Sequence, residues 1–346
     1  MTIWPKVPMR NTDDQHSNVS RRDFVRTTAI SIGGLGAGIV AGRGLASAAA
    51  AQSVQPPAAA DARGAHEKLC ITVSPSGQGS FVPAPPGPRT IAAHADAALQ
   101  GFNAGAAIVH LRGERVTQDP KVPQGRRGPN IENWRQLTEA VRSRCDIVIN
   151  YGSSAMEPAV RKPLLALKPE AGSFLVGHHY GGMAVTRENQ RQYAIDHLEA
   201  GVLPEVEIFH TGDLANLNAL IDTGLLRPPY CVTLFLEYER DYYRVPATLL
   251  QLQSMLELLP PNTHWTACVR GPKHLEMAAH AIALGGHVRT GLENDVELAP
   301  GRPARTQAEC VERIVQLARS VGREVATPRE ARQMLGLPRK PEKANS

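Results

Sequence analysis

The sequence predicts an α/β fold, a single-domain (β/α)8 TIM barrel, and three observations lead to this prediction. Short runs rich in apolar and β-branched residues are each followed by a longer helical pattern, eight times in about 260 residues. No G-x-G-x-x-G motif follows the first of these runs, which argues against a dinucleotide-binding open sheet. Eight such units in this length fit a closed parallel barrel better than a doubly wound sheet.

Each predicted element is justified by its local pattern. Strands are predicted at the short apolar runs, which are 69–74, 106–111, 146–150, 173–177, 205–209, 230–236, 263–268 and 285–290. Helices are predicted where longer amphipathic patterns follow, at 89–104, 130–144, 156–167, 187–201, 212–224, 246–259, 272–284 and 305–321. A last short helix is predicted at 327–335, because Thr327 is a good N-cap and Pro328 suits a first helical turn.

The first 51 residues resemble an export signal more than a part of the barrel. The run SRRDFVR (20–26) is typical of a twin-arginine signal, and a weakly apolar stretch and a small-residue run ending at Ala51 follow it. Glycines and Arg43 interrupt the apolar stretch, which argues against a membrane anchor of about 20 apolar residues. We therefore expect a twin-arginine signal peptide at 1–51, a flexible linker at 52–67, a catalytic barrel at 68–340, and a periplasmic protein with no membrane attachment after cleavage.

Charge and cysteine content limit the possible functions further. The formal net charge is +5, and residues 1–51 carry six Lys or Arg against three acids, so the remainder is nearly neutral. This charge argues against nucleic-acid binding. The five cysteines form no CxxC pair, and buried thiols are favoured over a disulfide, although an oxidising compartment keeps a disulfide possible.

In a TIM barrel the chemistry lies at the carboxyl ends of the strands, where the βα-loops begin. Polar side chains are predicted at five of these ends. They are His110, then Asn150 and Tyr151, then His178 and His179, then Glu237 and Glu239, and finally Arg289 and Glu293. We expect these residues to surround one catalytic mouth.

Two of these segments carry a resemblance to a known family. GAAIVHL (105–111) and GGHVRTGLEND (285–295) resemble the β-keto acid cleavage enzymes, the family typified by 3-keto-5-aminohexanoate cleavage enzyme. The resemblance also includes ITVSPSG, PEVEIFHTGDL (204–214) and VATPREARQMLGL, and it covers essentially all of 68–338. It implies a zinc-dependent (β/α)8 barrel, a transferase that converts a β-keto acid and acetyl-CoA into a new CoA thioester and acetoacetate. It also implies a homo-oligomer, specifically a homotetramer.

The resemblance assigns roles to individual residues. His110 matches the first zinc-ligating histidine of the family's H-x-H, Glu293 matches its zinc-ligating glutamate, and Arg289 matches its substrate-binding arginine. Two positions depart from the family pattern. Arg112 stands where the second histidine is expected, and Asn294 followed by Asp295 stands where the family has an acid/base aspartate. An asparagine keeps hydrogen bonding but cannot take up a proton at neutral pH.

Arg112 cannot bind zinc, because its guanidinium stays charged, so a metal site at His110 needs a further ligand. His178 or His179 is the first candidate, and His210, Glu237 and Glu239 are the others. His287 alternates with Arg289 along the eighth strand and is expected to point into the barrel as an interior histidine rather than a ligand. Ser153 and Ser173 lie near positions where the family has hydroxyl contacts to substrate.

Three functional hypotheses follow. The first is a metal-dependent carbon–carbon bond enzyme on the β-keto acid cleavage scaffold, with zinc as cofactor and acetyl-CoA as a second substrate. The second is a periplasmic lyase or hydrolase that acts on a small keto or carboxylic acid with a metal but without CoA. The third is a non-catalytic barrel in which Arg112 replaces the charge of the metal and, with Arg289, binds an anionic ligand.

Overall fold

The computed structural model describes residues 67–76, 87–116, 130–154, 156, 158–177, 184–240, 243–294 and 296–338. These residues belong to one compact unit within Pro56–Ser346, and a second unit, Met1–Gln55, lies outside the described ranges. The predicted export signal and the linker up to residue 66 are therefore outside the described residues. Three candidate site residues, His178, His179 and Asp295, are outside them as well.

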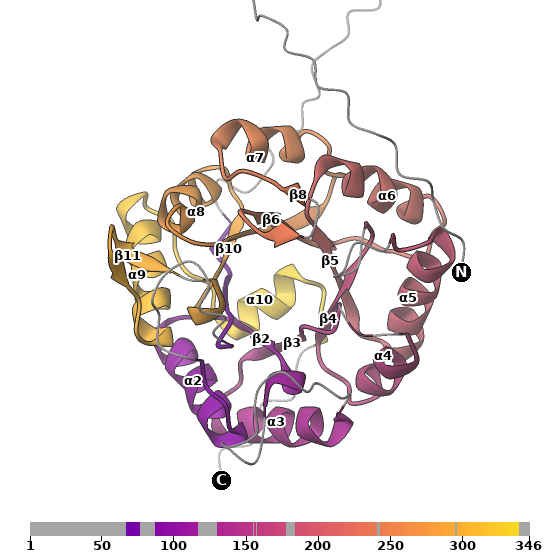
Figure 1. Ribbon diagram of the computed structural model, residues 1–346, viewed down its shortest axis with the longest axis horizontal. Helices are drawn as coiled ribbons and strands as arrows, with labels where there is room; N and C mark the ends of the chain where they lie inside the picture. The colour runs from indigo at the N-terminus through magenta and orange to yellow at the C-terminus, as the bar shows by residue number, and fades with distance from the viewer. Residues whose placement is uncertain are drawn as a thin grey trace, which may run out of the picture. The chain divides into compact units, whose positions relative to one another are not determined.

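Eight parallel strands close into a barrel, as the sequence predicts (Figure 1). The order around the barrel is β1-β10-β9-β6-β5-β4-β3-β2, and β2 returns to β1. The strands are β1 (Ile71–Val73), β2 (Ile108–Leu111), β3 (Val148–Tyr151), β4 (Ala171–Leu175), β5 (Leu203–Ile208), β6 (Tyr230–Leu236), β9 (Thr263–Val269) and β10 (His287–Thr290). Every barrel pairing is parallel, so all carboxyl ends of the strands meet at one mouth.

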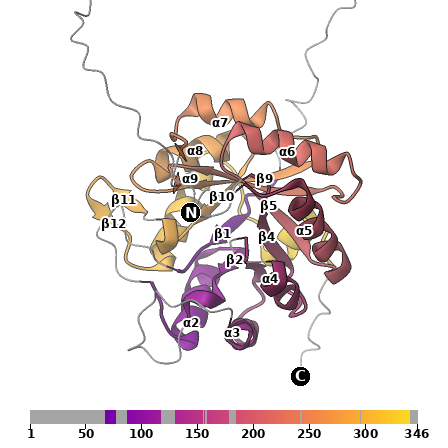
Figure 2. The same ribbon diagram turned by 45° about the vertical axis from the view of Figure 1, so that its right-hand side comes forward.

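Helices pack around the outside of this barrel (Figures 1 and 2). They are α2 (Ile91–Ala104), α3 (Ile131–Arg144), α4 (Pro158–Leu165), α5 (Arg187–Ala200), α6 (Thr211–Ile221), α7 (Leu249–Leu256), α8 (His274–Ala283) and α9 (Gln307–Ser320). Several begin with the side-chain caps that their sequences predict, for example Thr306 at α9. Within the described part of the chain, no helix combines the length and the apolar character that a membrane span needs.

Side chains on each strand alternate between the helical layer and the barrel interior. On β2, Val109 and Leu111 pack into the large apolar core under the helices, whereas His110 faces inward. On β10, Val288 joins that core, and His287 and Arg289 face inward as predicted. The apolar residues therefore hold the helices on the barrel, and the interior is left for polar groups.

A short helix, α10 (Pro328–Met334), closes the amino-terminal end of the barrel. Figure 1 shows it in the centre of the ring of strands. Ala331 of this helix and Leu335, directly after it, pack against Cys70 and Val148 in a separate apolar cluster. Thr327 caps this helix and Pro328 starts it, as the sequence predicts.

The structure differs from the predicted elements in the bounds of several elements and in two additional hairpins. For example, α7 spans Leu249–Leu256 rather than 246–259. Strand β4 begins at Ala171 rather than at residue 173, because Ala171 and Gly172 already pair with Leu203 and Pro204 of β5. Two small hairpins were not predicted, namely β7 (Glu239–Arg240) with β8 (Tyr243–Arg244), and β11 (Glu297–Ala299) with β12 (Arg302–Pro303). The run EYERDYYR (237–244) contains the first of them. Strands this short give no alternating pattern.

Candidate active site at the barrel mouth

His110 lies at the carboxyl end of β2 and is almost completely buried, with 1% of its surface exposed. Neither of its ring nitrogens has a hydrogen-bond partner among the described residues. Gly152 leaves room for it, because a Cβ at this position would collide with both His110 Nε2 and Arg112 Cδ. Burial, and then the charge of Arg289, hold the pKa of His110 well below its usual value, so the ring is neutral.

Glu293 lies in a short 3-10 turn (Leu292–Asn294) directly after β10. Gly291 precedes this turn and has a backbone φ of 128°, which favours glycine. A Cβ at this position would also collide with the backbone of Ser74. Ser74, at the end of β1, donates its hydroxyl to Glu293 Oε2 at 2.6 Å, and Arg289 Nη2 donates to the same oxygen at 2.9 Å. The loops after the first and last strands of the barrel, β1 and β10, therefore meet at this carboxylate.

Positive charge surrounds Glu293. Arg115 Nη1 lies 3.2 Å and Arg112 Nη1 3.5 Å from its Oε1. Burial alone would raise the pKa of Glu293, but Arg115, Arg289 and Arg112 outweigh it and hold the pKa well below its usual value. His110 also interacts electrostatically with this carboxylate, so the histidine and the glutamate share one charge environment.

Arg112 and Arg115 are fixed by a second buried carboxylate. Arg112 Nε donates to Glu114 Oε1 at 2.5 Å, and Arg115 Nε lies 3.9 Å from the same oxygen. Among the described residues of this cluster, three guanidinium groups, including that of Arg289, face two carboxylates. The cluster therefore carries an excess of one positive charge, which suits an anionic ligand.

Arg289 keeps donors available for such a ligand. It is 2% exposed, and its Nε and Nη1 have no hydrogen-bond partner among the described residues. The guanidinium carbon of Arg289 lies 5.5 Å from the ring centre of Phe235. The aromatic ring therefore restricts where the guanidinium group can move. Buried donors without a protein partner are uncommon and point to a ligand or to water.

Asn294, at the position of the family's aspartate, is held away from solvent by two side chains. Its Nδ2 donates to the hydroxyl of Tyr238 at 3.0 Å and to Cys268 Sγ at 3.1 Å. Its Oδ1 has no partner among the described residues. Burial raises the pKa of Cys268 to about 11 and that of Tyr238 well above its usual value, so both groups are neutral at physiological pH.

The remaining predicted site residues have other contacts. Ser173 Oγ donates to the carbonyl of Tyr151 at 3.2 Å, and Ser153 Oγ to that of Ser173 at 3.5 Å, so both hydroxyls bind the backbone. His210 Nε2 lies 3.3 Å from Asp213 at the start of α6. Glu237 accepts hydrogen bonds from Arg244 and the Ala247 amide, which fix the loop after β6, and Glu239 begins β7.

The sequence interpretation missed several polar residues at or below the mouth. Ser74 and Arg115 contact Glu293 directly, and Glu205 and Glu207 alternate along β5 with buried side chains that face the interior. Glu205 accepts hydrogen bonds from Asn150 and Thr233. In PEVEIF (204–209), glutamates alternate with apolar residues, and strand residues two positions apart share a face. This pattern could have indicated that the carboxylates of Glu205 and Glu207 both point into the barrel.

The described residues do not complete the zinc site that the resemblance implies. A catalytic zinc site typically uses three protein ligands. His110 offers a buried nitrogen without a partner, but both oxygens of Glu293 already face Ser74 or guanidinium groups. Arg112 adds positive charge where a second histidine would bind the ion. The first candidates for a third ligand, His178 and His179, lie outside the described residues.

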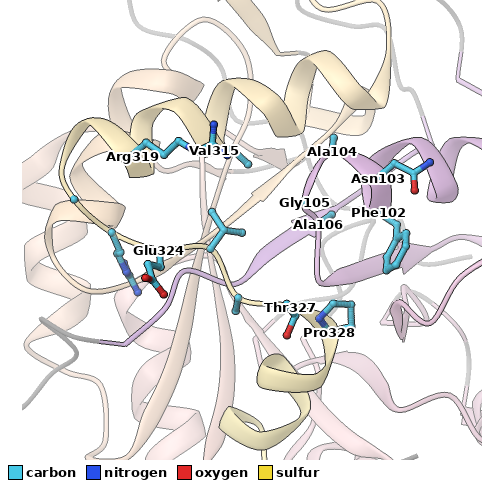
Figure 3. Close-up of a pocket in the computed structure, with 14 residues that line it drawn as sticks. Phe102, Asn103, Ala104, Gly105, Ala106, Val315, Arg319, Glu324, Thr327 and Pro328 are labelled. Atoms are coloured by element: carbon cyan, nitrogen blue, oxygen red, sulfur yellow. The ribbon is translucent and has the colours of Figure 1, made fainter. Parts of the chain in front are cut away.

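A cavity of about 750 Å³ opens at the opposite end of the barrel (Figure 3). It lies between the end of α2, the helix α9 and the segment 322–328, and its lining includes Phe102, Arg319 and Glu324. None of the predicted site residues lines it. The convergence of polar groups, rather than the size of a cavity, therefore identifies the mouth as the candidate site.

Comparisons with known proteins agree with this architecture. Residues 68–337 match the family described as beta-keto acid cleavage enzyme. A 3-keto-5-aminohexanoate cleavage enzyme of Fusobacterium nucleatum subsp. nucleatum is 33% identical over 280 residues, which cover 78% of this chain and 98% of that protein. A 3,5-dioxohexanoate:acetyl-CoA acetone transferase of Paraburkholderia graminis is 28% identical over 311 residues, which cover 78% and 96%.

A solved structure, the ternary complex of ObcA with C4-CoA adduct and oxalate, shares the fold. Its TM-score is 0.58 at 20% identity, and the match covers 72% of this chain and 67% of ObcA. At this identity the likeness concerns the barrel alone.

Proposed function

This chain belongs to the β-keto acid cleavage enzyme family, and we propose that it breaks and forms a carbon–carbon bond in a small β-keto acid, with acetyl-CoA as second substrate. The main support is the convergence of Arg289, Glu293 and His110 at the mouth, on the positions where the family has its substrate arginine and metal ligands. Relatives named as acetyl-CoA transferases support the second substrate.

The residues of the mouth suit the charge of such a substrate. The unpartnered Nε and Nη1 of Arg289 can donate to the carboxylate of the keto acid. The positive charges of Arg289, Arg112 and Arg115 together favour the negative charge that develops when the bond beside the ketone breaks. The neutral, buried His110, whose ring nitrogens have no partner among the described residues, can accept a hydrogen bond from the reacting group.

Zinc at His110 and Glu293, with His178 or His179 as third ligand, stays a prediction that elemental analysis can test. About one equivalent of zinc that is lost in His110→Ala would support it. The specific observation that favours metal-independent carboxylate binding is the guanidinium cluster around Glu293. In that case a keto acid should still bind after chelation, and Arg112→Ala should abolish binding.

The reaction itself can be tested on the full chain with acetyl-CoA and a panel of β-keto acids. Acetoacetate and a new acyl-CoA should form together, and Arg289→Met should reduce the rate at least about 100-fold. Arg319→Met, on the outer face of α9, is the matched control and should keep the rate. If no β-keto acid gives acetoacetate while keto acids still bind, the exchange reaction is wrong and the binding function remains.

A further inference from the structure

A second group of metal-ligating side chains lies at the closed end of the barrel, away from the mouth. Cys70, His264 and His287 each offer a ligand atom, and these atoms lie within 4.8 Å of one another. All three residues are buried, with exposed fractions of 1%, 7% and 2%. They come from the segment before β1 and from β9 and β10, which are neighbours in the barrel.

A fourth sulfur lies beside this group. Met334 Sδ, on the helix α10 that closes the barrel, is 3.4 Å from Cys70 Sγ. The donors are therefore one thiol, two imidazoles and one thioether. Thiol, imidazole and thioether ligands select copper or zinc ions over magnesium or calcium, and two histidines with one cysteine and a weak methionine are a known copper ligand set.

One donor of this group is left without a partner. His264 Nε2 is buried and has no hydrogen-bond partner among the described residues. Its ring stacks on that of His287, with centroids 3.7 Å apart and an interplanar angle of 14°. An orphaned nitrogen beside a buried thiol is a position that a bound ion would satisfy.

We propose that Cys70, His264 and His287, with Met334 as a weak fourth donor, bind a thiophilic transition-metal ion of the copper–zinc class. The ion would join strands β1, β9 and β10 to the closing helix, so its role would be structural. This site is independent of the function proposed for the mouth.

Binding needs small local changes. Tetrahedral ligands of one ion lie about 3.3–3.8 Å apart, so the three donors must approach by up to about 1 Å. His264 and His287 must also tilt out of their near-parallel stack, because each imidazole binds an ion in the plane of its ring. The Cys70 thiol must release its proton to solvent when the ion binds, and burial raises its pKa to about 12 when no ion is present. His287 Nδ1 accepts a hydrogen bond from the Cys70 amide at 3.0 Å, and ligation by the neutral ring requires this bond to be given up, either because Nδ1 binds the ion or because the proton moves from Nε2 to Nδ1.

Neighbouring charges set a second condition. Burial, and the positive charge of Arg323, keep the pKa of His264 at about 3, so its ring is in the neutral form that binds metals. Arg323 opposes an added cation, but its guanidinium is held by the carbonyls of Ile282, Gly285 and Gly286. The thiolate formed on binding would offset one charge of the ion.

The test uses the full chain, refolded under reducing conditions with Co²⁺, Zn²⁺ or Cu⁺ in separate samples. Co²⁺ gives a thiolate charge-transfer absorption that a site of His110 and Glu293 cannot produce. We expect this band in the wild type and in His110→Ala, and its loss in Cys70→Ser and His264→Leu. Cys310→Ala removes a buried thiol from a different cluster and should keep it.

The zinc and copper samples identify the ion. Each should retain about one equivalent after desalting in the wild type and in Cys310→Ala, and competition between the two ions gives the order of their affinities. If Cys70→Ser does not fold, His264→Leu gives the same comparison. The proposal is overturned if the wild type shows no thiolate band, or if the band persists in both variants at full strength.

Discussion

Replacing Arg112 by methionine should destabilise the folded protein by about 3 kcal/mol. The Arg112 and Glu114 side chains are only 7% and 2% exposed, and Nε lies 2.5 Å from Glu114 Oε1. In the second contact, Arg112 Nη1 lies 3.5 Å from Glu293 Oε1. The Coulomb attraction of this pair is about 5 kcal/mol at an effective dielectric constant of ~20, and the desolvation of both groups offsets part of it. Arg115 stays close to both carboxylates, which places the expected loss at the lower end of the usual ~3–5 kcal/mol for a broken buried pair.

The assay is urea unfolding followed by tryptophan fluorescence, because Trp134 is buried beside Gly113 in this turn. Glu114→Gln and the double variant with Arg112→Met complete a double-mutant cycle, with an expected coupling energy of about 1–3 kcal/mol. The exposed pair Arg135–Glu139 is the matched control and should give below about 0.5 kcal/mol. A coupling energy no larger than that of the control would refute the buried-pair reasoning.

Three further predictions concern other parts of the chain. Gly152→Ala should weaken binding of a small keto acid by at least about tenfold in calorimetry, because the new methyl group collides with two side chains of the mouth; unchanged affinity would contradict this. Burial, and then Glu207, raise the pKa of Glu205, so the native state holds this proton more tightly than the unfolded chain, and stability is lost as pH rises above about 4.5. Glu205→Gln should therefore be more stable than the wild type at pH 8 but not at pH 4, and equal curves would exclude an ionisation cost. Replacing both arginines at 21–22 by lysine should retain the protein in the cytoplasmic fraction, and unchanged export would rule out the twin-arginine signal.

Most of the fold could be predicted from the sequence, because each barrel unit repeats the same local signal. An apolar run such as YCVTLFL (230–236) can be buried on both faces only as an interior parallel strand, and β6 has these bounds. All five cysteines are free, and Cys70, Cys268 and Cys310 are buried, which agrees with the prediction of buried thiols. Only elements without periodicity, such as the two-residue strands, were missed.

The candidate site was predictable only in part. The family resemblance identified His110, Arg289 and Glu293, and the barrel topology explains why they converge. It gave no indication that Arg115 would join Arg112 on Glu293, because side-chain direction in a 3-10 turn does not follow a strand or helix period. The group at the closed end was equally invisible, since Cys70 and Met334 are 264 positions apart and neither belongs to a spacing motif.

The pairing of β1 with β10 has a consequence for how the protein is made. Ser74 and Glu293, which share a hydrogen bond across this seam, are separated by 219 positions. During translation the first strand therefore waits, with one edge unpaired, until nearly the whole chain has left the ribosome. A product truncated before β10 leaves this edge of β1 without its partner strand, and it lacks Arg289 and Glu293 of the mouth. The unpaired edge favours aggregation. Synthesis of the last barrel strand therefore both removes this aggregation-prone edge and completes the candidate site.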